Sequence, residues 1–548
     1  MPEHAGTNRR RFLTGAGAAA VALGGGAVVL NQAGAAGPSG RGGPRPTATP
    51  AVTVTPDDPR YADLVTGMNQ RWSATPEGVH LVTTTEQVVR AVDEAVQAGR
   101  RISVRSGGHC YEDFVYHADA QAVIDLSAMN RISYDAEMRA FAVEPGATML
   151  DVYETLYKTW GVTIPGGTTA GVGVGGLVPG GGYGLLARRD GLTADHLHAV
   201  EVVTVDADGT VAAHIATREA DDDNHELWWA HTGAGGGNFG IVTRFWFRTP
   251  GATGTDPTRL LPRPPATVLL SNAGLPWSAV TEDSFARLLD NFGAYFEEHQ
   301  TAGTTEGDLF SFLLLNHVSA GAIGVATQLD AAAPDARAVL DDYLAAVLDG
   351  VAPADSMPPP AELPWLRATT FVATSGIVSD PTLRAEHKSA YLKRRLPAEQ
   401  VAATYRHLTD AEFTNPNAML CVYSYGARVN EVAADATATS QRASVLKLLY
   451  QSFWHDPAED EANIGWLRAF YADVYAATGG VPAPDDLHEG CYINYPDADL
   501  SDDALNTSPT PWHELYFQQN YSRLQQVKAD WDPGDVFRHR QSVRLPGS

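Results

Sequence analysis

The sequence predicts an α+β protein with two folded parts, and three observations lead to this fold class. Over residues 61–250, short apolar runs typical of strands alternate with helical patterns, and glycine is frequent. Residues 250–265 are rich in turn-forming residues and indicate a boundary. Up to about residue 490 the chain has fewer glycines and longer amphipathic helices, as in a second domain of mixed type. A chain of 548 residues is also too long for one ordinary domain.

The first part begins with a helix and a strand. The sequence TTEQ at residues 84–87 is a capping box, and the helix that follows ends at Gly99. Ile102 and Val104 alternate as a strand that leads directly into SGGH at residues 106–109. We also expect strands over 122–126, 141–143 and 241–247, a helix over 149–160, and a hairpin formed by 200–205 and 210–215.

The second part combines amphipathic helices with apolar strands. Helices are predicted over residues 281–299, 335–348, 398–408 and 461–477, and strands over 309–315, 324–329 and 419–425. The sequence pattern changes again after Tyr492, and a last helix is predicted over residues 512–528.

The N-terminus has the layout of an export signal. The pair Arg9-Arg10 is followed by a weakly apolar stretch from residue 15 to 30 and by small residues at 33–35. This order predicts a twin-arginine-type signal over residues 1–36, an exported protein and the twin-arginine machinery as a partner. The apolar stretch is too short and too weak for a membrane span, so we expect no membrane association after signal removal. Residues 37–60 are rich in Pro, Gly and Thr and are predicted to be a linker.

Charge and cysteine usage exclude several kinds of partner. The chain has 65 acidic and 39 basic side chains, a formal net charge of −26. Nucleic acids and anionic membranes need a basic surface, so neither is expected as a partner. Cys110, Cys421 and Cys491 form no disulfide framework and no metal-ligand spacing, and we expect no metal.

Glycine clusters at residues 107–108, 166–184 and 233–240 indicate a large ligand. Glycine lets the backbone approach a ligand closely and present bare N–H groups to anionic oxygens. Three such loops in one domain favour a ligand with a pyrophosphate. Residues 171–176 formally match G-x-G-x-x-G, but prolines at 165 and 179 flank them, so a helix cannot start there as a Rossmann fold requires.

These motifs resemble a known family. VRSGGH at 104–109, GGLVPGGGYG at 175–184 and GGGNFGIV at 235–242 look like the FAD domain of berberine-bridge-enzyme-like oxidases, in the vanillyl-alcohol-oxidase/PCMH flavoprotein superfamily. YINYPD at 492–497 and residues 516–542 are similar to the family's C-terminal segment. The resemblance implies a two-subdomain PCMH-type FAD-binding domain over 61–252, a substrate domain with an antiparallel sheet over 253–490, and a C-terminal segment over 491–545 that returns to the FAD domain.

The resemblance also implies how the cofactor is held. His109 is expected to be linked through a ring nitrogen to the 8α-methyl of FAD, and an imidazole exposed by two glycines is suited to that reaction. Many family members have a second link through a cysteine, but Thr169 occupies that position, and a hydroxyl does not replace a thiolate. We therefore predict a single covalent bond. Val172 matches a small gatekeeper position in relatives that react with oxygen, which favours an oxidase.

The resemblance places further residues at the cofactor and the substrate. Tyr495 is the expected base and Tyr492 lines the same pocket, although the sequence does not reveal what activates a tyrosine at neutral pH. Tyr423 and Tyr425 are more typical of structural residues. The other predicted cofactor contacts are Arg105, Ser106, Gly107, Gly108, Thr168, Thr169, Val172, Gly173, Gly176, Gly180, Gly181, Tyr183, Gly184, Asn238, Gly240, Ile241, Val242, Asn494 and Asn520.

The predicted function is an FAD-dependent oxidase that takes a hydride from an alcohol, a sugar or a secondary metabolite and reduces O₂ to H₂O₂. Two alternatives stay open: a flavin-dependent oxygenase of the same fold, and a redox-silent flavin-binding protein. Labelled O₂ separates the first, because an oxidase puts no label into the product. Anaerobic substrate addition that never bleaches the flavin would indicate the second.

Overall fold

The computed structural model describes residues 50–353 and 358–547. The predicted signal and most of the predicted linker lie outside these residues. The linker prediction is wrong at its end, because strand β1 (Val52–Val54) pairs antiparallel with β2 (Gly78–Leu81). Backbone hydrogen bonds to β2 make this segment part of a sheet, which its Thr- and Pro-rich composition does not indicate. In the described ranges no helix is long and apolar enough to cross a membrane.

The first part contains two sheets with helix α2 (Thr85–Gln97) between them. The four-stranded sheet has the order β1-β2-β4-β3, in which β4 (Ala122–Asp125) pairs in parallel with β2 and with β3 (Ile102–Arg105). The second sheet is antiparallel with the order β5-β6-β9-β7-β8. Its strands are Ile132–Asp135, Ala140–Val143, Ile241–Phe247, Leu197–Val205 and Val211–Thr217. The predicted hairpin is confirmed as β7 and β8, and helix α3 is found at Met149–Trp160 as predicted.

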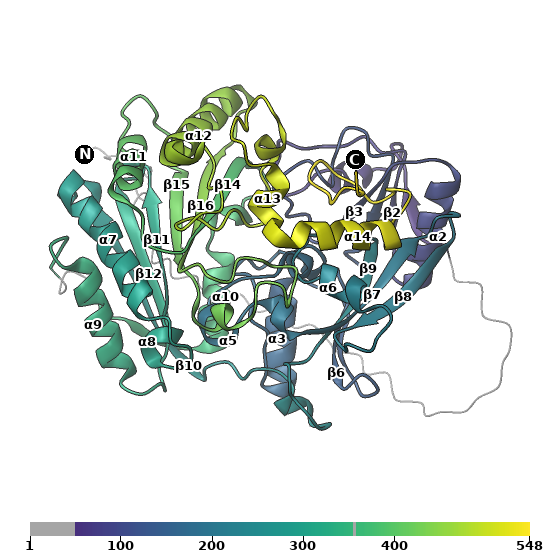
Figure 1. Cartoon of the computed structure of the whole chain (residues 1–548), viewed down its shortest axis with the longest axis horizontal. Helices are drawn as coiled ribbons and strands as arrows, with labels where there is room; N and C mark the ends of the chain where they lie inside the picture. Colours follow the sequence, from purple (N-terminus) through teal and green to yellow (C-terminus); the bar gives the residue numbers. More distant parts are fainter. Residues whose placement is uncertain (1–49, 354–357, 548) are drawn as a thin grey trace, which may run out of the picture.

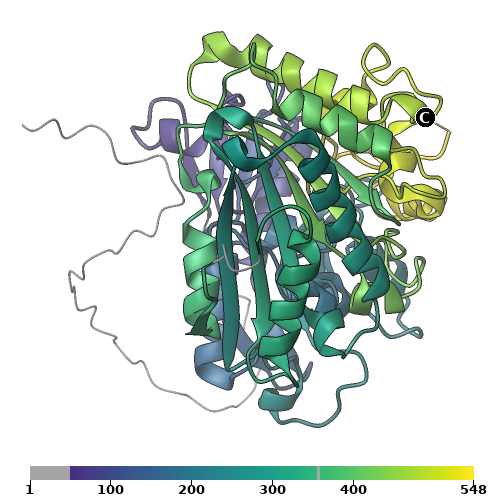
Figure 2. The ribbon, with the colours of Figure 1, turned by 90° about the vertical axis from the view of Figure 1, so that its left-hand side faces the viewer.

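The second part is a seven-stranded antiparallel sheet, as expected, with the order β13-β10-β12-β11-β15-β16-β14. Its strands in that order are Ala361–Pro364, Thr267–Pro276, Ala322–Asp330, Phe310–Asn316, Ala418–Ser424, Leu446–Trp454 and Arg384–Leu392. Helices α7 (Glu282–Glu298), α9 (Ala336–Leu348), α11 (Ala398–Leu408) and α12 (Asp460–Val474) cover its outer face (Figures 1 and 2). The other face is turned toward the first part.

The C-terminal segment crosses back to the first part (Figure 1). The single helix predicted over 512–528 is wrong: α13 (Trp512–Phe517) ends where Gln518 adopts a left-handed φ of 48°, and α14 (Tyr521–Trp531) starts anew. In α14 the buried Lys528 ammonium donates hydrogen bonds to the carbonyls of Asn238 and Phe537 at 2.8 and 2.6 Å and pairs with Asp532 at 2.6 Å. This ammonium therefore ties the C-terminal segment to the third glycine cluster.

Candidate active site

A cavity with about 1930 Å³ of empty volume lies between the first part, the seven-stranded sheet and the C-terminal segment. All three glycine clusters contribute to its wall. The sequence-predicted site residues that line it are Ser106, Gly107, Gly108, His109, Thr168, Thr169, Val172, Gly173, Gly176, Tyr183, Gly184, Gly240, Ile241, Val242, Tyr492, Asn494 and Tyr495.

The first two glycine clusters lie so close together that no side chain fits between them. A Cβ atom on Gly107 would lie 2.4 Å from the backbone nitrogen of Gly173, and one on Gly173 would lie 2.1 Å from Oγ of Ser106. In the same wall, a Cβ atom on Gly184 would meet the carbonyl oxygen of Gly166 at 1.6 Å. Glycine is required here for close backbone packing, and the same packing leaves room for a ligand against bare backbone.

His109 faces the cavity from the loop after β3. Burial, with the nearby charge of Arg105 adding to it, lowers the pKa of His109 to about 4, so the imidazole is neutral at pH 7. A Cβ atom on Gly171 would lie 2.8 Å from Nε2 of His109, so glycine at 171 keeps the imidazole from being covered. A neutral imidazole with an accessible nitrogen lone pair is the form that can act as a nucleophile. Thr169 lines the same cavity, and as a threonine it offers no thiol there.

Tyr492 and Tyr495 form one wall of the cavity, with ring centroids 5.0 Å apart. The Tyr492 oxygen accepts hydrogen bonds from the Gly182 N–H at 3.1 Å and from the Asn494 amide at 2.9 Å. Tyr495 is only partly buried, and within the described ranges its hydroxyl has no hydrogen-bond partner. Tyr492 is therefore fixed by its neighbours, whereas the Tyr495 hydroxyl is available to a ligand.

Lys447 on β16 is a site residue that the sequence reasoning missed. Its ammonium lies 3.8, 4.2 and 4.3 Å from the ring centroids of Tyr492, Tyr183 and Tyr495. The side chain is fully buried, and among the described residues its Nζ atom has no hydrogen-bond partner. Burial lowers the pKa of Lys447 well below its usual value and raises the pKa of Tyr495. Burial thus disfavours the charged form of both groups, and an ion pair between them would have to offset that cost.

Part of the cavity wall is aromatic. Tyr111, Tyr183, Phe310 and Tyr423 line the cavity, and the Tyr111 ring stacks between His387 at 3.6 Å and Tyr495 at 5.7 Å. Such a wall suits a ligand with flat apolar faces, and the few hydroxyls within it can fix an orientation.

Five predicted cofactor contacts lie behind the cavity wall. Arg105 pairs with Asp125 at 2.8 Å, and its guanidinium lies under Gly108. The side-chain amide of Asn238 donates to the carbonyls of Ala234 and Gly235, so it shapes the third glycine cluster from inside.

The other three support neighbouring segments. Gly180 leaves space for the Asn494 side chain, since a Cβ atom would lie 2.0 Å from Oδ1. Gly181 packs against Thr439 with a φ of 103°. The Asn520 amide donates to the carbonyl of Ala434 at 2.8 Å. Tyr425 is buried and donates to the Gln441 carbonyl, while Tyr423 does line the cavity.

The fold and this cavity define an FAD-linked oxidoreductase. Residues 76–213 match the model of the FAD binding domain, and residues 491–544 match the model described as berberine and berberine like. The glycine-lined cavity with its exposed imidazole is consistent with FAD as the cofactor.

Comparison with known proteins gives the family. The chain is 50% identical to aclacinomycin-N/aclacinomycin-A oxidase of Streptomyces galilaeus, over 98% of each chain. It is 32% identical to hexose oxidase of Chondrus crispus, over 89% of this chain and 94% of that one. A crystal structure of a glycopeptide hexose oxidase complexed with teicoplanin is 45% identical, with a TM-score of 0.85 over 90% of this chain and 99% of that one. The chain therefore belongs to the berberine-bridge-enzyme-like FAD-linked oxidases, and the predicted family and fold class are confirmed.

Proposed function

We propose that this oxidase acts on a hydroxyl-bearing carbon of a sugar, either free or attached to a larger scaffold, with FAD joined to the chain through His109 alone. The observation that carries the proposal is the Tyr495 hydroxyl, which faces the cavity without a partner while the Lys447 ammonium lies over its ring. This is the arrangement needed to take a proton from a substrate hydroxyl.

The reaction oxidises the carbinol carbon to a carbonyl. FAD held by His109 and the glycine clusters would supply the acceptor for the hydride from that carbon, and its reoxidation by O₂ with the two protons released would give H₂O₂. The hydroxyl proton goes to the Tyr495 phenolate, whose charge the Lys447 ammonium offsets. Tyr492 is held by two N–H donors and keeps the neighbouring Tyr495 ring in place. The aromatic wall positions the sugar and excludes water.

Two relatives support a sugar as the substrate class, since their names describe them as a hexose oxidase and a glycopeptide hexose oxidase. The test is a panel of free hexoses and of glycosides with an attached scaffold, with H₂O₂ detection and anaerobic flavin spectra. We expect bleaching of the flavin and one H₂O₂ per carbonyl formed. A panel in which only non-sugar alcohols react would overturn the sugar proposal.

The single covalent link has its own test. We expect flavin to stay with the peptide that contains His109 after acid denaturation, and to be released completely from H109A. Because a neutral imidazole is needed, attachment should proceed at pH 7 and slow as the pH falls toward about 4, where the protonated form accumulates. Flavin found on a second peptide of the wild type would contradict the single link.

The twin-arginine signal at residues 1–36 lies outside the described residues, and we propose that it directs export. A reporter fused to this segment should be exported, and replacement of Arg9 and Arg10 by lysine should stop export. Unchanged export of that variant would refute this route.

A further inference from the structure

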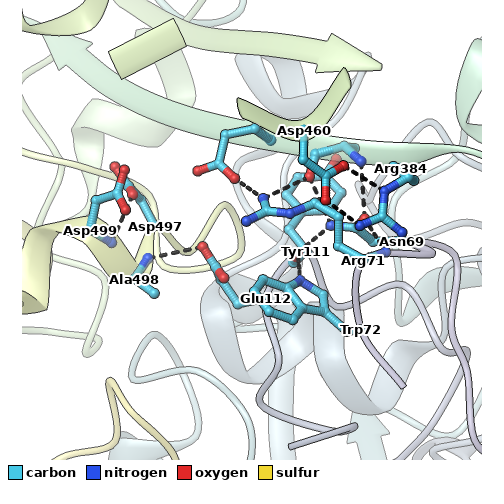
Figure 3. Close-up of polar contacts among 12 residues, drawn as sticks. Asn69, Arg71, Trp72, Tyr111, Glu112, Arg384, Asp460, Asp497, Ala498 and Asp499 are labelled. Carbon is cyan, nitrogen blue, oxygen red and sulfur yellow. Dashed lines mark hydrogen bonds and ion pairs between the residues drawn. The ribbon is translucent and has the colours of Figure 1, made fainter. Parts of the chain in front are cut away.

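Three carboxylates lie together where three segments meet, and two of them, Glu112 and Asp497, are labelled in Figure 3. Glu112 is in the loop after His109, Glu386 is on β14, and Asp497 follows Tyr495. All three are buried, and one oxygen of each lies within 4.8 Å of the others. We call these residues the carboxylate cluster.

Basic side chains neutralise two of the three carboxylates. Arg71 pairs with Glu386, and the Lys388 ammonium lies 2.9 Å from both oxygens of Asp497. These cations already offset two of the three negative charges, so we do not assign a metal to the cluster. Glu112 forms no ion pair with any residue in the described ranges.

The surrounding charges leave one negative charge in excess. Asp499 forms ion pairs with Lys388, at 2.7 Å, and with Arg468. Asp460 forms an ion pair with Arg384. On the Glu112 loop, Asp113 pairs with Arg540 at 3.3 Å. Every carboxylate around the cluster thus forms an ion pair except Glu112, on which the Arg71 guanidinium acts only beyond ion-pair distance while it pairs with Glu386. An unpaired carboxylate excluded from water is costly unless it takes up a proton.

We propose that Glu112 is a positioning residue that acts as a neutral carboxylic acid, joining the flavin-attachment loop to the tyrosine segment through the hydrogen bond that Ala498 donates to it. One of its oxygens accepts the Ala498 N–H at 2.9 Å. Asp497 and Glu386 each have an oxygen within 4.8 Å of a Glu112 oxygen, so a further negative charge on Glu112 would be unfavourable there. Burial, with Asp497 adding to it, raises the pKa of Glu112 to about 8.

The position of this bond links it to the reaction. Glu112 is three residues after His109, and Ala498 is three residues after Tyr495. A neutral Glu112 therefore fixes the distance between the proposed flavin link and the proposed base, and ionised Glu112 would repel Asp497 across the same contact. This inference rests on the proposed function for its effect on turnover, but not for its protonation.

The experiment compares the purified holoenzyme with its E112Q, E112A and D113N variants. Glutamine has the shape of a protonated glutamate and both accepts and donates, so E112Q should keep turnover and lose the decline of kcat/KM above pH 8, where wild type should fall up to tenfold per pH unit. E112A should lose turnover at every pH. D113N, a neighbouring buried carboxylate, should keep the wild-type profile.

Two readouts do not need substrate. The infrared spectrum of wild type at pH 7 should contain a protonated carboxyl band that disappears in E112Q and persists in D113N. The unfolded glutamate has the lower pKa, so the Tm of wild type relative to E112Q should fall as pH rises from about 5 to 8 and then stay level.

A wild-type spectrum without that band, or a Tm difference that does not change with pH, would overturn the proposal even if sugar oxidation is confirmed. A Tm that chelators lower in wild type but not in E112Q would also overturn it, since a cation would then take the place of the proton. Failure to oxidise sugars would leave these two readouts unchanged.

Discussion

Replacing Lys447 by methionine should separate activity from stability. Methionine has a similar length and no charge, so K447M keeps the packing among the three tyrosine rings and removes the ammonium. Two opposite charges at 4.3 Å attract by about 4 kcal/mol at an effective dielectric constant of about 20. The phenolic charge is spread beyond the ring centre, so we expect about 3 kcal/mol of the stabilisation of the Tyr495 phenolate to be lost. This corresponds to a rate of flavin reduction lower by roughly 100-fold.

The Tm should not fall. The Lys447 amine is fully buried and unpartnered within the described ranges, and such a polar group costs about 1–3 kcal/mol. Its removal should leave the Tm unchanged or raise it. Anaerobic stopped-flow measures flavin reduction as a function of pH, and the pH of half-maximal rate in K447M should rise by about two units, because burial still raises the pKa of Tyr495 while the cation is gone.

Lys388 is the matched control. It is also buried in the seven-stranded sheet, but Asp497 and Asp499 hold its ammonium. K388M leaves the buried Asp497 without a cation, while Asp499 keeps Arg468, and should lower the free energy of unfolding by about 3–5 kcal/mol. If K447M instead lost stability as K388M does and reduced its flavin at the wild-type rate, Lys447 would be a structural residue and the reasoning would fail.

Three further substitutions test other parts of the site. Y495F should lower the rate of flavin reduction by about 10²–10⁴-fold while Y492F lowers it less, because only the Tyr495 hydroxyl is free toward the cavity; equal effects in stopped-flow would contradict this. T169C restores the thiol of relatives with two links, and peptide mass mapping should find flavin on two peptides; flavin on one peptide alone would show that residue 169 is out of reach. D532N leaves the buried Lys528 ammonium with Asp535 at 3.0 Å as its remaining carboxylate and should cost about 1.5–3 kcal/mol in denaturant unfolding, whereas a change under 1 kcal/mol would show that Asp535 and the backbone carbonyls suffice.

The sequence predicted the parts of the site that depend on local backbone. The loop after β3 needs glycine beside glycine, and this requirement is visible in SGGH as directly as in the structure. The hairpin of β7 and β8 was likewise predictable, because its apolar alternation surrounds an Asp-Gly turn.

The sequence analysis did not predict Lys447 as a site residue because it did not predict strand β16, on which Lys447 lies. Strand β16 is buried along its whole length and contains Lys447, Gln451 and Ser452, so it has no regular apolar alternation. Strand β14 is similar, with Glu386, His387 and Lys388 nearly all buried. One signal was present: a lysine inside the apolar run of residues 445–450 is unusual, since lysine is rarely buried without a partner.

Neither part of the molecule can make the site alone. The first part supplies His109 and the glycine clusters, the C-terminal segment supplies Tyr492 and Tyr495, and the sheet supplies Lys447. Tyr495 reaches the cavity only when the C-terminal segment lies between the first part and the sheet. The Lys528 ammonium holds this segment at the third glycine cluster through its hydrogen bond to the Asn238 carbonyl. Two of the three rings around the Lys447 ammonium, those of Tyr492 and Tyr495, belong to that segment, so the surroundings of Lys447 are complete only when the proposed base is present. In the proposed reaction the sheet therefore contributes to the chemistry through Lys447, in addition to forming part of the cavity wall.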